Sequence, residues 1–447
     1  MSQTAADAAA AASRRLHPLT PFARGWKIIA VAIAFAGQEA AFDLDATRFL
    51  VGLAVVVPVA ALYGILSWWF TRYQVDGDDL RLETGVVFRR TRHVRLERLQ
   101  TVDVVRPLAA RFLGLAELRL EVAGGTSSEA PLAYLAEPDA RRLRAELLAR
   151  AAGVAPETEE APERVLVRVP ASALATSIAL SAGTVLAVLF GALLVVVAVV
   201  LRQPAVVIPL LPTVLGVAAA VSRSFTSNFD FTVAESPDGL RLRHGLLEQR
   251  SQTVPPGRIQ AVRLVEPPLW RLLDQRRGWV KVEVNVAGYG GQGLEEGQRT
   301  SVLLPVAPRA VAHGLIARAV PVGDLGALEL VPAPRRARWR RPITWRGLGY
   351  GVGDAVFVAR RGVLRREVDI IAHGKTQSVR VTQGPWERRL RLASVHLDST
   401  PGPVHVEAAL RDSREARELV EAQAGRSRLA RRSAGPDRWM TPPGPAR

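Results

Sequence analysis

An uncharged stretch from Ala171 to Leu201 limits most strongly what this chain can fold into. About 20 apolar residues in a helix, at about 1.5 Å per residue, are enough to cross the hydrocarbon core of a bilayer. In lipid such a segment has to be helical, because every backbone N–H and C=O must find a partner within the segment. After Arg202 a second uncharged run continues from Gln203 to Ser222. The two runs together predict a transmembrane helical hairpin.

Two further apolar segments near the N-terminus predict another hairpin. Phe49 to Phe70 is uncharged and closes with two tryptophans, which are typical of the membrane interface. Trp26 to Phe42 is shorter and carries Glu39 near its end. The competing interpretation of this first segment is a signal peptide, because basic residues precede a short apolar core. The second apolar segment follows after only a few residues, which favours the hairpin.

Basic residues flank these segments on one side only. The turns inside the two hairpins carry just Arg48 and Arg202. The flanking cations are Arg14, Arg15, Arg24 and Lys27 before the first segment, and Arg72, Arg81, Arg89, Arg90 and Arg92 after the second. The positive-inside rule then places both termini and all large loops in the cytoplasm. We therefore expect a multi-pass protein of the inner membrane.

The charge balance indicates what such a chain meets. Lys and Arg number 59 and Asp and Glu number 42, which gives a formal net charge of +17. In a soluble protein this excess would suggest nucleic acid. Here the expected partner is the anionic face of the bilayer, and no nucleic acid, because no aromatic platform or zinc-finger spacing accompanies the cations. The absence of cysteine from the sequence excludes disulfides and thiolate metal sites.

One sequence unit occurs three times in the polar parts of the chain. The copies run from Leu80 to Gly124, from Leu240 to Gly288, and from Val356 onward. The matching positions are Gly85, Gly245 and Gly362, then Arg98-Leu99-Gln100, Arg258-Ile259-Gln260 and Lys375-Thr376-Gln377, then Pro107 and Pro267, and then Arg111 and Arg271. The first two copies align without a gap through this motif. The recurrence is more specific than any single copy.

Each copy predicts short strands followed by one closing helix. Apolar and polar residues alternate on both sides of the shared glycine, which is typical of two strands joined by a tight turn. The closing helices are expected in EPDARRLRAELLARAA, APRAVAHGLIARAV and DSREARELVEAQA. Pro138 stands in a first helical turn, where a missing N–H costs nothing. Asp412 and Glu415 have the spacing of a capping box.

The chain resembles the bacterial pleckstrin-homology-like membrane proteins, which were once catalogued as a domain of unknown function. The resemblance lies in the paired membrane helices and in the repeated motif that follows them, G-(V/L)-x-x-R, R-(L/I)-Q-x-V and P-x-x-R-x-L. The three-copy, four-helix layout resembles their longer, YdbT-type members. The resemblance covers about Trp26 to Ala424. It implies an α+β fold, namely a polytopic membrane protein with two transmembrane hairpins and three β-barrel or sandwich modules, each capped by a C-terminal helix. The second copy departs from the pattern at Pro255-Pro256, and the third around Gly384-Pro385.

The residues do not predict catalysis. The Arg and Gln of the R-(L/I)-Q element are expected to bond loop carbonyls and fix how strands meet. His396 and His405 flank a turn but lack a third metal ligand, so solvated strand positions are the better interpretation. Glu39 near a helix end is a weak intramembrane candidate. We therefore expect no enzyme, no cofactor and no metal.

A segment rich in arginine and tryptophan is the candidate site. RRARWRRPITWRG, from Arg335 to Gly347, is hereafter the basic segment. Its expected membrane-surface residues are Arg335, Arg336, Arg338, Trp339, Arg340, Arg341 and Trp345. Arginine meets lipid phosphate and tryptophan lies at headgroup depth, so the composition predicts contact with anionic headgroups. A solvated interdomain linker is the alternative.

These expectations give a domain map and a function. The expected parts are a disordered N-terminus (1–24), a transmembrane hairpin (25–71), a module (72–152), a linker (153–168), a second hairpin (169–223), a second module (224–322), the basic linker (323–347), a third module (348–424) and a disordered tail (425–447). We expect a membrane scaffold or adaptor that self-associates or binds a protein partner, with a loose link to envelope stress. A transporter or export accessory subunit is the alternative.

Overall fold

The computed structural model describes residues 14–15, 69–76, 79–84, 90–95, 99–122, 129–151, 163–203, 210–236, 239–254, 257–273, 278–287, 301–320 and 328–433, with scattered positions between 54 and 66. The predicted segment Trp26 to Phe42 lies outside these residues, and so does most of Phe49 to Phe70. The chain divides into two compact units. Unit 1 is residues 1–160 with 247–252, and unit 2 is residues 161–246 with 253–447.

The three repeats have one order of elements: four strands, a fifth strand, a short helix, two more strands and a closing helix. Repeat 1 contains β1 (Arg14–Arg15), β2 (Arg72–Asp76), β3 (Asp79–Thr84), β4 (Arg90–Arg95), β5 (Leu99–Pro107), α4 (Leu108–Phe112), β6 (Leu115–Val122), β7 (Glu129–Ala136) and α5 (Glu137–Ala151). Repeat 2 contains β8 (Arg164–Arg168), β9 (Thr232–Ser236), β10 (Gly239–His244), β11 (Glu248–Val254), β12 (Ile259–Glu266), α9 (Pro268–Leu273), β13 (Trp279–Val286), β14 (Val302–Pro308) and α11 (Arg309–Ala319). Repeat 3 contains β15 (Val331–Pro332), β16 (Gly349–Val352), β17 (Val356–Arg361), β18 (Arg366–Ala372), β19 (Ser378–Thr382), α12 (Pro385–Arg389), β20 (Leu392–Asp398), β21 (Val406–Asp412) and α13 (Ser413–Ser433).

The shared glycine forms the turn between the third and fourth strands, as the sequence predicts. Gly245 has φ 110° and Gly362 has φ 81°, in the left-handed region that favours glycine. A Cβ on Gly362 would also collide with the backbone carbonyl of Arg365. Gly85 lies outside the described residues, although β3 and β4 on either side of it are described.

Strand pairing crosses the boundary between repeats 2 and 3, which the sequence did not predict. In unit 2 one antiparallel sheet has the order β14-β13-β12-β18-β17-β16-β15. It therefore joins the last three strands of repeat 2 to the first four strands of repeat 3. All eight residues of β12 are buried, because the strand has a partner along each edge and its side chains enter two different cores. The remaining strands of repeat 3 form a separate sheet, β19-β20-β21.

The boundary between repeats 1 and 2 is paired in the same way. In unit 1 the fifth strand of repeat 1, β5, pairs antiparallel with the fourth strand of repeat 2, β11. Val104 lies opposite Ser251 there, and Leu264 lies opposite Val368 at the other boundary. Val104 and Leu264 are equivalent positions counted from Arg98 and Arg258, and Ser251 and Val368 are equivalent counted from Gly245 and Gly362. The two boundaries thus have one register.

The hydrophobic cores of unit 2 also mix residues from two repeats. Val356, Val358 and Ile370 of repeat 3 belong to the main core of repeat 2. Conversely, Ala261 of repeat 2 belongs to the core of repeat 3 with Phe357. This sharing follows from the joint sheet, because successive side chains of one strand face opposite sides.

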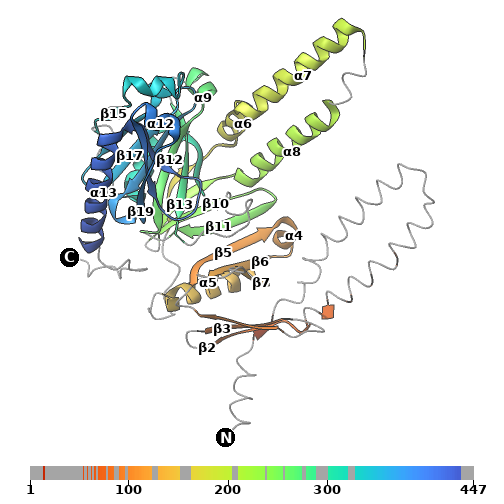
Figure 1. Cartoon of the computed structure of the whole chain (residues 1–447). Helices are drawn as coiled ribbons and strands as arrows, with labels where there is room; N and C mark the ends of the chain where they lie inside the picture. The colour runs from red at the N-terminus through yellow and green to blue at the C-terminus, as the bar shows by residue number, and fades with distance from the viewer. Residues whose placement is uncertain are drawn as a thin grey trace. The chain divides into compact units, whose positions relative to one another are not determined.

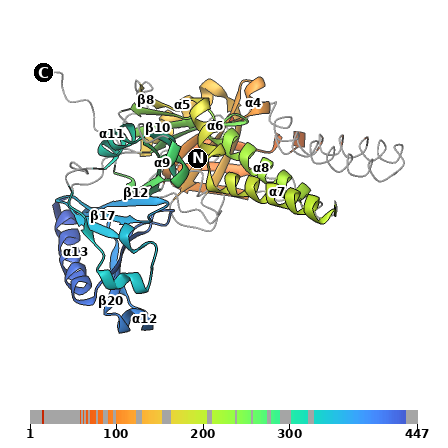
Figure 2. The same cartoon turned by 90° about the horizontal axis from the view of Figure 1, so that it is seen from above.

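The closing helices α5 and α11 form where the sequence predicts them, and α13 lies along the strands of repeat 3 (Figure 2). α13 begins where predicted but continues to Ser433, so the expectation that the disordered tail starts at residue 425 is wrong. The capping box predicted for α13 forms only in part. Asp412 Oδ1 accepts the backbone N–H of Arg414 at 2.9 Å. Glu415 instead accepts Arg411 Nη2 at 2.6 Å and the Tyr350 hydroxyl at 3.0 Å. Its carboxylate therefore holds the helix to the sheet.

The long uncharged run divides into two helices. α6 (Ala171–Ala179) ends before Ser181, whose side chain accepts the backbone N–H of Thr184 at 3.2 Å and caps α7 (Ala182–Leu201). α6 packs on repeat 2, where Trp270 Nε1 donates to Ser177 O at 3.1 Å. α7 is exposed and runs beside α8 (Leu210–Asn228), away from the strands of unit 2 (Figure 1).

Among the described helices, α7 alone is long and apolar enough to cross a membrane. The expectation of two transmembrane hairpins is therefore supported for one helix and not for four. Two features explain why the second predicted hairpin has only one such helix. α6 packs its apolar residues into the core of repeat 2, and α8 carries Arg223 and polar side chains in its last turns.

Candidate functional site

The basic segment occupies the same place in repeat 3 as the apolar segments do in the sequence of the other repeats. In repeat 2, α6, α7 and α8 are inserted between the first strand β8 and the second strand β9. In repeat 1 the predicted apolar segments fall between β1 and β2. In repeat 3 the segment between β15 and β16 contains η3 (Arg335–Trp339) and η4 (Trp345–Gly347). Sequence comparison alone did not reveal this equivalence, because the first strands are too short to align.

The structure folds the basic segment onto repeat 3 and leaves most of its predicted site residues exposed. Ala337 and Leu348 are buried in a small core with Leu392 and Leu410. Arg335, Arg338, Trp339, Arg340 and Arg341 are exposed, whereas Arg336 pairs with Asp412 and Trp345 packs against this small core. The seven predicted residues thus divide into five exposed side chains and two that hold the segment in place.

Apolar side chains lie among the exposed cations of the segment. Trp339 is 65% exposed and Ile343 is 73% exposed. The Arg338 guanidinium lies 5.2 Å from the centroid of the Trp339 ring. Exposed aromatic and aliphatic groups beside arginines suit the interface of a bilayer, where the apolar groups enter the headgroup region and the cations meet phosphate.

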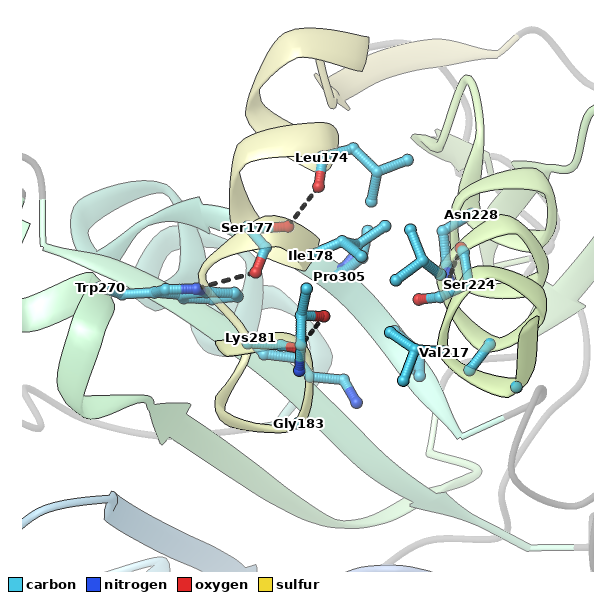
Figure 3. Close-up of a pocket in the computed structure, with 16 residues that line it drawn as sticks. Leu174, Ser177, Ile178, Gly183, Val217, Ser224, Asn228, Trp270, Lys281 and Pro305 are labelled. Atoms are coloured by element: carbon cyan, nitrogen blue, oxygen red, sulfur yellow. Dashed lines mark hydrogen bonds between the residues drawn. The ribbon is translucent and has the colours of Figure 1, made fainter. Parts of the chain in front are cut away.

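A pocket of about 460 Å³ lies where α7 meets repeat 2 (Figure 3). Its walls come from α6, α7, α8, β13 and β14, and most lining side chains are small or apolar. Ser177 and Trp270 bond to each other along one wall, and Lys281 reaches in from β13. Lys281 Nζ pairs with Glu283 at 2.8 Å. From α7 only Gly183 and Thr184, in its first turn, line the pocket.

A second cavity, of about 970 Å³, lies between the closing helices of repeats 2 and 3. Arg318, Lys375 and Arg426 line it together with Asp354 and His373. His373 is 2% exposed, and its Nε2 lies 2.9 Å from Gly353 O. Gln423 Nε2 donates to its Nδ1 at 2.9 Å. Burial lowers the pKa of His373, and the Arg426 cation lowers it further, against the raising effect of the Gly353 hydrogen bond.

The residues of the repeated motif are used for assembly of the fold. Gln260 Nε2 donates to Arg258 O at 3.1 Å, so the expected bond from this glutamine to loop carbonyls is confirmed. Arg271 Nη1 donates to Val363 O at 2.8 Å. Val363 follows the turn glycine of repeat 3, so the motif arginine of one repeat binds the glycine turn of the next.

Two polar contacts missed by the sequence analysis join repeats 2 and 3. Arg263 Nε donates to Asp369 Oδ1 at 2.5 Å, and both side chains are almost fully buried. Asn285 is 1% exposed and bonds to the loop between β20 and β21. Its amide donates to Val404 O at 2.7 Å, and its Oδ1 accepts Val404 N–H at 2.9 Å. No pattern within one repeat marks these residues, because their partners come from the next repeat.

The two histidines considered as metal ligands lie in different surroundings. His396 Nε2 lies 2.8 Å from Thr382 Oγ1, and His405 is exposed. Within the described residues there is no group of three or more side chains that could hold a metal ion. Glu39 lies outside those residues.

The strand repeat, its glycine turn and its closing helix define a class of protein. The family described as Bacterial PH domain matches residues 28–151, 173–319 and 318–427, so the chain belongs to this family with three copies of the domain. Among curated proteins it is similar to the UPF0699 transmembrane protein YdbT of Bacillus subtilis (strain 168), with 23% identity over 301 residues. The match covers 59% of this chain and 59% of the relative. No solved structure matches the chain.

Proposed function

We propose that this protein is a non-enzymatic membrane scaffold or adaptor, anchored by apolar helices, that presents three PH-like repeats to lipid headgroups and to a protein partner. The observation that carries the proposal is the use of the repeated motif. Gln260 and Arg271 bond to backbone carbonyls of loops and of the next repeat. Gln260 thus fixes a loop within repeat 2, and Arg271 holds repeat 2 to repeat 3, which suits an assembly platform.

Membrane attachment is supported by α7 and by the relative. α7 is a 20-residue helix, and only 6% of its most apolar stretch is buried within the protein. Its apolar side chains therefore need an apolar surrounding such as lipid. The similar protein YdbT is named a transmembrane protein. We propose an inner-membrane location with several spans and with both termini in the cytoplasm, following the distribution of arginine in the sequence.

Contact with anionic lipid is supported by the place of the basic segment. It stands where the other two repeats carry apolar segments, and it exposes Trp339 and Ile343 among four arginines. A cation near an anionic bilayer surface contributes about 1 kcal/mol. Arg335, Arg338, Arg340 and Arg341 together are then sufficient to hold the segment at the headgroups.

The lipid contact is tested in the full chain, which has no cysteine of its own. Ile343→Cys is labelled with an environment-sensitive dye in nanodiscs of phosphatidylglycerol or phosphatidylcholine. The dye emission is expected to shift to the blue in phosphatidylglycerol only, and the shift should fall as salt rises, because exposed charges are screened. Changing the four exposed arginines to Gln should remove it.

Leu429→Cys is the matched control, because Leu429 is 67% exposed on α13 and away from the segment in sequence. Its emission should be equal in both lipids. Equal emission from Ile343→Cys in the two lipids, or a shift that survives the Gln changes, contradicts the lipid contact.

The scaffold role is tested by cross-linking in membranes, mild detergent extraction and mass spectrometry. Wild-type protein is expected to retain a reproducible partner, which is either a second protein or another copy of this chain. Asp369→Arg places two cations at the boundary of repeats 2 and 3 and should release that partner. If wild type retains only the background found with an unrelated membrane protein, the scaffold role is wrong.

A further inference from the structure

The two boundaries between repeats show one way of pairing the outer edge of a fifth strand. At each boundary the fifth strand of one repeat pairs antiparallel with the fourth strand of the next, β5 with β11 and β12 with β18. Both pairs have the same register. The fifth strand of repeat 3, β19, pairs with β20, and no described strand lies along its other edge.

The outer edge of β19 is open in the part of the chain that the structure describes. β19 lies at the edge of the sheet β19-β20-β21, and none of its five residues is buried. Val381 is 42% exposed, whereas Leu264, at the equivalent position of β12, is 4% exposed. An open edge with an exposed apolar side chain is a template for a further strand.

The side chains along β19 repeat the chemistry that binds β18. Arg380 stands at the position of Arg263, which forms the buried ion pair with Asp369. Its side chain is 57% exposed, and Asp398 Oδ2 accepts its Nε at 3.0 Å. Arg388 stands at the position of Arg271, which binds the glycine turn of the incoming hairpin, and it is exposed.

A second copy of this chain is a poor occupant of the edge. Among the described residues, the fourth strand of a repeat that has a partner along only one edge is β4, in the sheet β1-β2-β3-β4. In the shared register Arg92 of β4 stands where β18 has Asp369, because Arg92 pairs with Leu82 as Asp369 pairs with Ala359. Arg92 would lie opposite Arg380, and like charges directly opposite in a sheet are destabilising.

We propose that the edge of β19 binds an extended strand of another protein, with an acidic residue opposite Arg380 and a turn at Arg388. This inference rests on the proposed scaffold function and names the chemistry of its partner. Main-chain hydrogen bonds along β19 supply affinity, and the carboxylate opposite Arg380 sets the register. The exposed Trp386 of α12, 55% exposed, adds an apolar contact beside the turn.

The probe is a fluorescent peptide with the sequence of residues 364–373, which contains β18, added to the full chain in nanodiscs. Wild type is expected to bind it saturably, with hydrogen-exchange protection at Ser378–Thr382. Arg380→Glu should weaken binding at least about tenfold, because the paired carboxylate then meets a like charge. A peptide with Lys at the position of Asp369 should restore binding to Arg380→Glu and bind wild type poorly.

Arg417→Glu is the matched control, with the same charge change at an exposed position of α13. It should bind the peptide as wild type does. The inference is overturned if wild type does not bind, if Arg380→Glu binds equally, if protection falls outside β19, or if wild type self-associates through Arg380. Retention of the cross-linked partner by Arg380→Glu would overturn this inference alone and leave the scaffold role standing.

Discussion

Arg263 and Asp369 belong to different repeats and form one buried ion pair, with Nε and Oδ1 2.5 Å apart. Arg263 Nη1 also donates to Pro403 O at 2.6 Å, so the same guanidinium contacts two elements of repeat 3. The pair lies opposite in register on β12 and β18. It fixes the relative position of two strands that are far apart in the sequence.

Asp369→Asn keeps the size of the side chain and removes its charge. The buried Arg263 then lacks its counter-ion, and we expect a loss of about 3–5 kcal/mol in the free energy of unfolding of unit 2. Denaturation in detergent, with hydrogen exchange of β12 and β18, measures the loss. The double change Arg263→Met with Asp369→Leu should recover most of it. Unchanged stability of Asp369→Asn would show that the pair contributes nothing.

Gly402 is expected to tolerate no side chain. A Cβ there would collide with the carboxamide of Asn285, which is buried and bonded to Val404. Gly402→Ala should displace Asn285 and cost about 1–3 kcal/mol, because buried polar groups lose their partners. Gly314→Ala is the control, since nothing lies within 4 Å of a Cβ there and α11 should gain stability. Equal melting temperatures for the two variants would contradict the contact.

The stability of repeat 3 is expected to depend on pH through His373. Its pKa is lowered in the folded protein by burial, while in the unfolded chain it is about 6.5. The unfolded chain therefore takes up the proton first as pH falls below about 6.5, and the stability present above that value is lost. His373→Gln should be less stable but should lose this dependence. Urea denaturation from pH 8 to pH 5 measures the free energy of unfolding of both proteins. If that free energy falls equally with pH in wild type and in His373→Gln, the histidine is not the cause.

The chain has no cysteine, so single introduced cysteines report where α7 lies. Leu189→Cys and Val195→Cys, both exposed on α7, should resist a membrane-impermeant maleimide in intact cells and in vesicles. Leu364→Cys, in the β17–β18 turn, should react only from the cytoplasmic side. Rapid labelling of Leu189→Cys would show that α7 is not in lipid.

The proposed topology makes an independent prediction. Reporter fusions after Arg150, Val320 and Arg447 should all read cytoplasmic, because the basic flanks of the apolar segments place these loops on one side. Export of the fusion after Arg150 would mean that the first apolar segment is a signal peptide or does not span. That result would change the membrane map without affecting the pairing of the repeats.

Local features were accessible from the sequence because they depend on neighbouring residues. The turn at Gly362 needs a left-handed backbone, and the sequence shows the glycine directly. α5 and α13 were predicted from residues at their starts, namely Pro138 for α5, and Asp412 with Glu415 for α13. The candidate site was found by composition, but composition could not separate the exposed Trp339 from Trp345, which packs in a core.

Contacts between repeats depended on information that no single repeat contains. Arg263 and Asn285 look like ordinary strand residues until their partners in repeat 3 are placed beside them. The end of α6 was also hidden, because an uncharged sequence is compatible with lipid and with a protein core. Trp270 donates a hydrogen bond to Ser177 O and holds α6 against repeat 2, so α6 lies in the protein core and not in lipid.

The sequence by itself determined the repeat, its glycine turns, its closing helices and an apolar helix at α7, because these follow from backbone preference and from side-chain periodicity over a few residues. Only the tertiary structure decided that consecutive repeats share a sheet through β12 and β18. It also decided that β19 lies at the edge of its sheet among the described strands. All strand edges offer the same backbone donors and acceptors, so the side chains that lie opposite each other select which strands pair. Those side-chain contacts form only in the folded chain.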